Sequence, residues 1–230
     1  MNGIVIAPAH NSPGINKRTG TAWHDASGAF IPEARAFAKR HGFPPPTLFD
    51  NRRPYPARRR QVEAAIRAAA RPLDVAALMQ HGWRDGTQSG HLRDHARGLA
   101  ELLAECSSPS LCVAVMACDT GRDGDNERSD DDDPGPGGEG GWADLLRDEL
   151  VRAGVTGCRV LAHATPAHAT RNAYLREFRA DQPTGGSWIV EPDSALWPAW
   201  VRALKGSLRF DLPFLTTVEV HARLASWPPP

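Results

Sequence analysis

The chain of 230 residues lacks most of the features that mark specialised classes of protein. Its 27 lysine and arginine residues equal its 27 aspartate and glutamate residues, so it carries no net charge. This balance argues against general binding to nucleic acids or to membrane surfaces. No apolar run approaches the ~20 residues that span a bilayer. The N-terminus also lacks the basic flank and the length of a signal peptide.

Cysteine is scarce, and its spacing excludes the common metal and redox patterns. The four cysteines, at positions 106, 112, 118 and 158, form no Cys-x-x-Cys pair. A chain of this length can bury a hydrophobic core without disulfides. We therefore expect reduced thiols and a cytoplasmic protein.

Continuous apolar runs alternate with amphipathic stretches along the chain. The apolar runs predict strands at 3–7, 47–49, 75–79, 111–117, 159–162 and 187–190. The amphipathic stretches predict helices at 33–41, 59–70, 92–105, 142–153 and 196–204. This alternation is typical of βαβ crossovers. We expect one α/β domain over residues 1–222, a three-layer α/β/α sandwich with a mostly parallel sheet.

Two segments depart from this pattern. Residues 123–141 are acidic, rich in glycine and proline and almost free of apolar side chains. They cannot bury themselves, so we expect a mobile loop within the domain. Residues 223–230 form a proline-rich tail.

Two predicted strands end in residues that can carry out chemistry. One run leads into His81, Gly82 and Trp83, and the other ends in Ala117, Cys118 and Asp119. The carboxyl ends of parallel strands share one sheet edge, where ligands bind in open α/β folds. There an imidazole can activate a thiol as a nucleophile. The Gly82 backbone N–H can approach a substrate carbonyl oxygen and help to form an oxyanion hole.

These motifs resemble the caspase-like cysteine peptidases of clan CD, which include caspases, metacaspases and CHAT proteases. Ala-Cys-Asp-Thr-Gly, residues 117–121, is close to the Ala-Cys-Glu-Thr-Gly pattern common in CHAT domains. The resemblance covers about residues 1–160 in element order. It implies a caspase-like fold, Cys118 as nucleophile, His81 as its partner, a peptide or protein substrate and no cofactor. Many relatives have serine or glycine before the His-Gly pair, whereas this chain has Gln80.

A second interpretation is a zinc-dependent hydrolase. The order His10, Glu33, His81 resembles zinc-dependent N-acetylmuramoyl-L-alanine amidases, with Glu191 as general base. Zinc would then activate a water molecule that attacks an amide. This interpretation leaves the motif around Cys118 unexplained. A third possibility is a catalytically inactive caspase-like interaction module.

Other polar residues could contact a substrate. His10 follows the first predicted strand, and His163, His168 and Asn172 lie in the segment that follows the strand predicted at 159–162. His91 and His95 have helical i, i+4 spacing, but the charged residues around them predict an exposed helix face.

Overall fold

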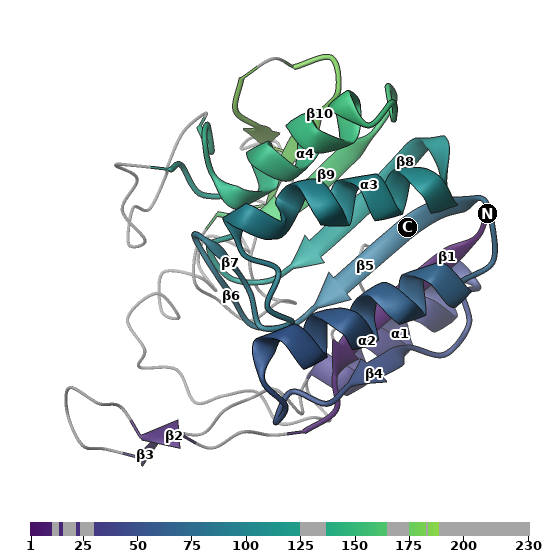
Figure 1. The fold of residues 1–230 in the computed structure, drawn as a ribbon, viewed down its shortest axis with the longest axis vertical. Coiled ribbons are helices and arrows are strands. Elements are labelled where there is room, and N and C mark those ends of the chain that lie inside the picture. Colours follow the sequence, from purple (N-terminus) through teal and green to yellow (C-terminus); the bar gives the residue numbers. More distant parts are fainter. Residues whose placement is uncertain are drawn as a thin grey trace, which may run out of the picture.

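The computed structural model describes residues 1–10, 14–15, 22–23, 30–124, 137–164, 175–182 and 184–188, and the structural statements below concern these residues. Their main element is a seven-stranded sheet with the strand order β11-β10-β9-β8-β5-β1-β4 (Figure 1). In chain order the strands are β1 (Gly3–Pro8), β4 (Thr47–Phe49), β5 (Leu73–Met79), β8 (Ser107–Met116), β9 (Arg159–His163), β10 (Leu175–Arg179) and β11 (Ser187–Trp188). From β4 to β9 neighbouring strands are parallel, whereas β10 and β11 are added antiparallel.

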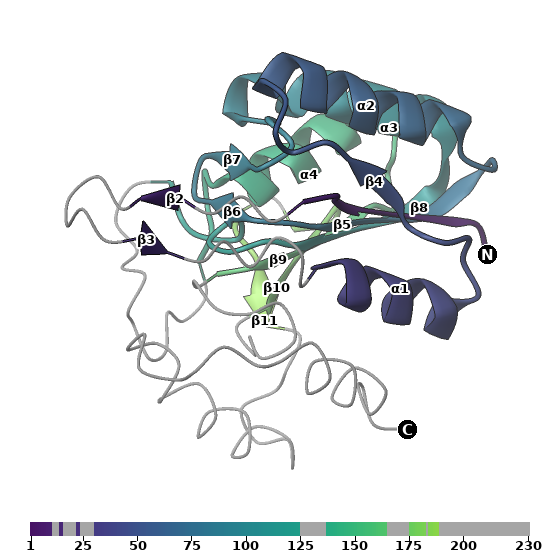
Figure 2. The same cartoon turned by 90° about the horizontal axis from the view of Figure 1, so that it is seen from below.

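Helices lie on both faces of this sheet. Helices α2 (Tyr55–Ala68), α3 (Ala96–Cys106) and α4 (Trp142–Arg152) cover one face, and α1 (Phe30–His41) covers the other (Figure 2). A one-turn 3₁₀ helix (Arg93–His95) leads into α3. Two small hairpins complete the described structure, β2 (Gly14–Ile15) with β3 (Ala22–Trp23) and β6 (Gly82–Trp83) with β7 (Gly86–Thr87).

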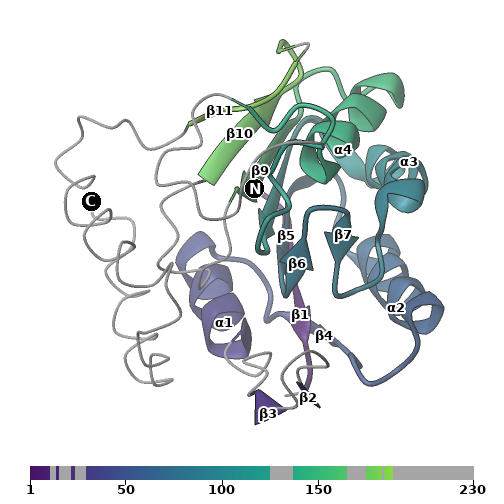
Figure 3. The same cartoon turned by 90° about the vertical axis from the view of Figure 1, so that its left-hand side faces the viewer.

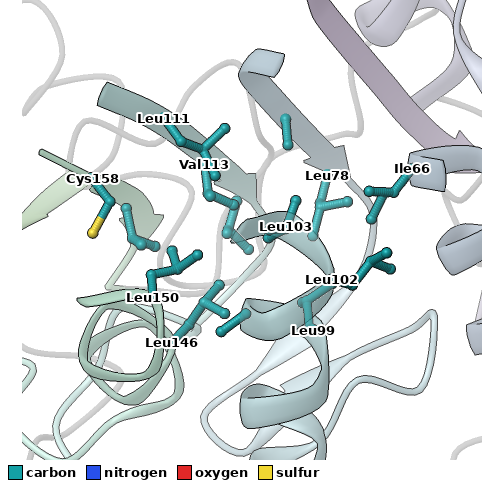
Figure 4. Close-up of a cluster of buried hydrophobic side chains, with 14 of the residues drawn as sticks. Ile66, Leu78, Leu99, Leu102, Leu103, Leu111, Val113, Leu146, Leu150 and Cys158 are labelled. Carbon is teal, nitrogen blue, oxygen red and sulfur yellow. The ribbon is translucent and has the colours of Figure 1, made fainter. Parts of the chain in front are cut away.

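Alternate residues of the strands supply the cores on the two faces. Leu78 and Val113 pack with Leu99, Leu103 and other side chains from α2, α3 and α4 (Figure 4). The opposite positions of the same strands form a smaller core with α1, which contains Val5, Ala7, Phe30, Ala34, Ala77, Met79 and Ala114. Burying each large apolar side chain stabilises the fold by about 1.5–3 kcal/mol relative to leaving it exposed. This two-sided burial explains why the central strands are continuously apolar.

The structure confirms the mixed α/β class and the mostly parallel sheet. Helix α2 begins at Tyr55, four residues before the expected start, because Pro56 in its first turn needs no intrahelical acceptor. Strand β10 was not predicted, since its sequence, Leu-Arg-Glu-Phe-Arg, carries charge at three of five positions. The β6–β7 hairpin was also missed. The expected helix at 196–204 and the tail at 223–230 lie outside the described residues.

None of the helices in the described part of the chain is both long enough and apolar enough to cross a membrane.

Candidate functional site

The ends of β5 and β8 lie side by side. Their parallel register pairs Met79 with Met116, and the Gln80 backbone N–H donates to the Met116 carbonyl at 3.3 Å. His81 and Cys118 each stand two residues beyond this last pair, His81 after β5 and Cys118 in the turn that follows β8. A Cβ on Gly82 would lie 2.8 Å from the Cys118 carbonyl oxygen, so these backbones are already in contact. Figure 3 looks onto this edge of the sheet, with the β6–β7 hairpin in front.

His81 lies on the α1 side of this sheet edge. Met79 and Met116 pack toward α1, whereas Ala117 belongs to the core on the opposite face. Since strand side chains alternate, the residue two positions beyond Met79 returns to the α1 side. There the His81 ring meets the Phe30 ring edge-on, with centroids 5.1 Å apart. Both His81 and Cys118 are partly exposed.

The turn that carries Cys118 is sharply bent. Asp119 adopts a φ of +58°, which is uncommon for a residue other than glycine. The Thr120 hydroxyl donates to the Ala117 carbonyl at 2.8 Å and closes the turn. Within the turn the Arg122 guanidinium lies 3.8 Å from the Asp119 carboxylate. The resulting bend separates Cys118 from the regular hydrogen bonding of β8.

More distant elements hold the same turn in place. The Gly121 N–H donates to the His163 carbonyl at 2.8 Å, and the Ala143 N–H donates to the Thr120 carbonyl at 3.0 Å. The buried Arg176 side chain of β10 donates to the Gly121 carbonyl at 2.9 Å. A Cβ on Gly121 would lie 2.6 Å from the Ala162 carbonyl oxygen, so this close approach requires glycine.

The loop after His81 is held by short-range polar contacts. Gln88 binds both backbone groups of His81: its N–H donates to the His81 carbonyl at 2.8 Å, and its side-chain oxygen accepts from the His81 N–H at 3.4 Å. The Ser89 N–H donates to the Gln80 side chain at 2.7 Å. On the outer side, Arg58 and Arg59 of α2 donate to the carbonyls of Gln88 and Gly90.

A buried hydrogen-bonded chain lies inside this loop. The Ser89 hydroxyl is 3.0 Å from that of Thr87 and 2.9 Å from His91 Nδ1, and all three side chains are fully buried. His91 Nε2 is 3.8 Å from the Glu63 carboxylate, and hydrogen bonding to His91 lowers the pKa of Glu63. The prediction of an exposed helix face at His91 is therefore wrong. The residue precedes α3 in an extended segment and turns inward.

Cys118 differs from the other three cysteines in its accessibility. Cys106, Cys112 and Cys158 are buried, and Cys118 is partly exposed. Burial raises the pKa of Cys112 and raises that of Cys158 to about 11, which disfavours their thiolates.

Of the remaining candidate residues, His163 contacts the Cys118 turn through its carbonyl oxygen, whereas His10 contacts Asn51 and Asp50. His10 follows β1, where it exchanges backbone hydrogen bonds with the Asn51 side chain and its Nε2 lies 3.5 Å from the Asp50 carboxylate. His163 ends β9 and is buried. Trp83 lies in the β6–β7 hairpin, its ring centroid 6.3 Å from that of Tyr55. His168, Asn172 and Glu191 lie outside the described residues.

Glu33 is a buried carboxyl group close to this edge. It lies in the first turn of α1, one helical turn after Phe30, and is 1% exposed. Loss of hydration raises its pKa to about 8. Among the described residues, no group of three or more His, Cys, Asp or Glu side chains is arranged to hold a metal ion. His10, Glu33 and His81 therefore do not form such a group.

The two described ends of the acidic segment, residues 123–124 and 137–141, lie next to the Cys118 turn. The Gly124 N–H donates to the Glu139 carbonyl at 2.9 Å, and Gly137 bridges to Gly186 just before β11. Residues 125–136, between these two ends, lie outside the described part of the chain.

Comparison of the chain with protein-family models, with curated proteins and with solved structures found no match in any of the three.

Proposed function

We propose that this protein is a cysteine hydrolase with a caspase-like three-layer fold, and that it cleaves peptide bonds through Cys118 and His81. One observation carries the proposal: the partly exposed His81 and Cys118 follow the ends of the neighbouring parallel strands β5 and β8, and Gly82 packs against the Cys118 backbone. The bend at Asp119 supports it, because a nucleophile at a sharp turn is presented clear of its strand.

In the proposed reaction, His81 accepts the proton of the Cys118 thiol, and the sulfur attacks the scissile carbonyl carbon. The Gly82 N–H donates to the developing oxyanion. As the C–N bond breaks, His81 transfers the proton to the leaving amine and an acyl-enzyme thioester remains. His81 then deprotonates a water molecule, which attacks the thioester. The carboxylic acid product leaves and the thiol is restored.

Selective alkylation tests this pairing without a known substrate. Dilute iodoacetamide at neutral pH, followed by peptide mass spectrometry, gives a separate rate for each cysteine. We expect Cys118 to react at least tenfold faster than Cys106, Cys112 and Cys158. Exposure alone would favour Cys118, so the decisive comparison is with His81→Ala, which should remove most of this advantage.

His41→Ala is the matched control. His41 lies at the far end of α1 from Phe30, about 16 Å along the helix, and its loss should leave Cys118 unchanged. Equal rates for Cys118 in wild type and in His81→Ala would overturn the proposed pair. A zinc hydrolase or an inactive interaction module would give that result, and the two are separated by zinc analysis of the purified protein.

A further inference from the structure

Arg176 is a fully buried arginine in β10, and its side chain contacts the turn that carries the proposed nucleophile. It donates to the Gly121 carbonyl at 2.9 Å, three residues after Cys118. Its guanidinium also fills the space beside Gly137, where a Cβ would lie 3.0 Å from an Arg176 nitrogen. The guanidinium is thus enclosed between the Cys118 turn and the returning end of the acidic segment.

An arginine is a costly way to make such a contact, because removing a guanidinium from water costs several kcal/mol. The apolar residues Val113 and Val160 and the buried Phe178 show that neighbouring positions of the sheet are filled by side chains without charge. A polar group that could be replaced by an apolar one, yet is fully buried in contact with the turn that carries a proposed nucleophile, is a candidate for a functional role.

The charge of Arg176 acts in the direction that the proposed reaction requires. A nearby positive charge favours a thiolate over a thiol. The other charged groups of the turn, Asp119 and Arg122, face each other at 3.8 Å and largely offset one another. Around the turn, His81 stands at the end of β5, the buried His163 at the end of β9 and the buried Asp144 on α4, next to Ala143.

We propose that Arg176 is a positioning residue for Cys118: it fixes the 118–122 turn through Gly121, and its charge favours the Cys118 thiolate. This inference rests on the proposed function, since it concerns the reactivity of the same thiol.

The test is the pH profile of Cys118 alkylation by iodoacetamide, read by peptide mass spectrometry. Arg176→Gln removes the charge, and we expect the midpoint of the profile to rise by about one pH unit. Alkylation at pH 7 should slow roughly tenfold. Arg176→Lys keeps the charge but not the planar arrangement of donors. Its midpoint should therefore stay near that of wild type.

Arg147→Gln is the matched control, because Arg147 is also buried but contacts Asp144, Asp148 and the Arg179 carbonyl rather than the Cys118 turn. It should lose stability without moving the Cys118 midpoint. If Arg176→Gln does not fold, the test uses Arg176→Lys alone. A Cys118 midpoint in Arg176→Lys that is one pH unit above the wild-type midpoint would contradict the role of charge.

An unchanged midpoint in folded Arg176→Gln would overturn the inference. That result differs from failure of the proposed function, in which His81→Ala leaves the Cys118 rate unchanged. Each outcome is measurable whether or not the other occurs.

Discussion

His81 and Cys118 stand at the same sheet edge, but the structure holds them by different means. The His81 backbone is bound on both its N–H and its carbonyl by Gln88, which is seven positions away in the chain. The Cys118 turn is held by β9 and β10, and Arg176 is 55 positions from Gly121. Local contacts can form as soon as a hairpin closes, whereas the support of Cys118 requires most of the sheet. The Cys118 turn is therefore held by contacts from more distant parts of the chain than the His81 backbone is.

The largest expected effect concerns Glu33, on the helix that meets His81. Its folded pKa, about 8, is above the ordinary value of 4.5, so its neutral form is favoured in the folded state. The free energy of unfolding is therefore highest below pH ~4.5 and falls as the pH rises toward 8. At ~1.4 kcal/mol per pH unit, the free energy of unfolding should fall by on the order of 5 kcal/mol.

Urea denaturation of wild type and Glu33→Gln at pH 5, 6.5 and 8 checks this expectation, and the variant should lose most of the slope. Glu63→Gln is the control of opposite sign, because the lowered pKa of Glu63 gives stability that is lost as pH falls. Hydrogen exchange should show the alkaline loosening in α1 and 81–91 before 117–124. If hydrogen exchange rose equally in 81–91 and in 117–124, His81 and the Cys118 turn would not be held independently.

A smaller effect is expected from Gly121→Ala on the Cys118 side. The new methyl group would lie 2.6 Å from the Ala162 carbonyl oxygen, and backbone atoms cannot easily move aside. We expect the free energy of unfolding to fall by about 2–3 kcal/mol. We also expect Cys118 to lose its faster alkylation relative to the other cysteines.

Gly98→Ala provides the matched control. Gly98 lies in α3 with open space around it, so alanine should stabilise the protein by about 0.5–1 kcal/mol. If Gly121→Ala kept the stability and the Cys118 reactivity of wild type, the close contact between Gly121 and the Ala162 carbonyl would not be what fixes the turn.

The smallest of these effects is expected from Ser89→Ala on the His81 side. Its hydroxyl joins Thr87 to His91 in a fully buried chain. Removing it leaves buried polar atoms without that partner, at a cost of about 1–3 kcal/mol. Hydrogen exchange should rise in residues 81–91 and stay near wild type in 117–124. The exposed Ser110→Ala should be neutral, within about 0.5 kcal/mol. Equal loosening of both segments by Ser89→Ala would contradict a locally held His81.

The sequence predicted the sheet edge well because its signals are local. Continuous apolar runs marked β1, β5 and β8, and the residues that follow β5 and β8 were recognised as candidates for chemistry. The polar segment Thr-Gln-Ser-Gly-His at 87–91 was the available signal for the buried chain around Ser89. It was not recognised, because polar residues after a strand are usually solvated and burial is not visible in the sequence.

What the sequence by itself determined is the identity of the chemical groups and the strand that precedes each, since strand formation follows from apolar runs of a few residues. Only the tertiary structure decided that β5 and β8 are neighbours, so that His81 and Cys118 follow strand ends at one edge of the sheet. It also decided the burial of Glu33, and the contact of Arg176 with Gly121. These depend on residues far apart in the chain, and β10 becomes a strand because β9 offers it a paired edge despite its charges. Because β10 is charged, sequence patterns alone do not predict the strand whose Arg176 holds the Cys118 turn.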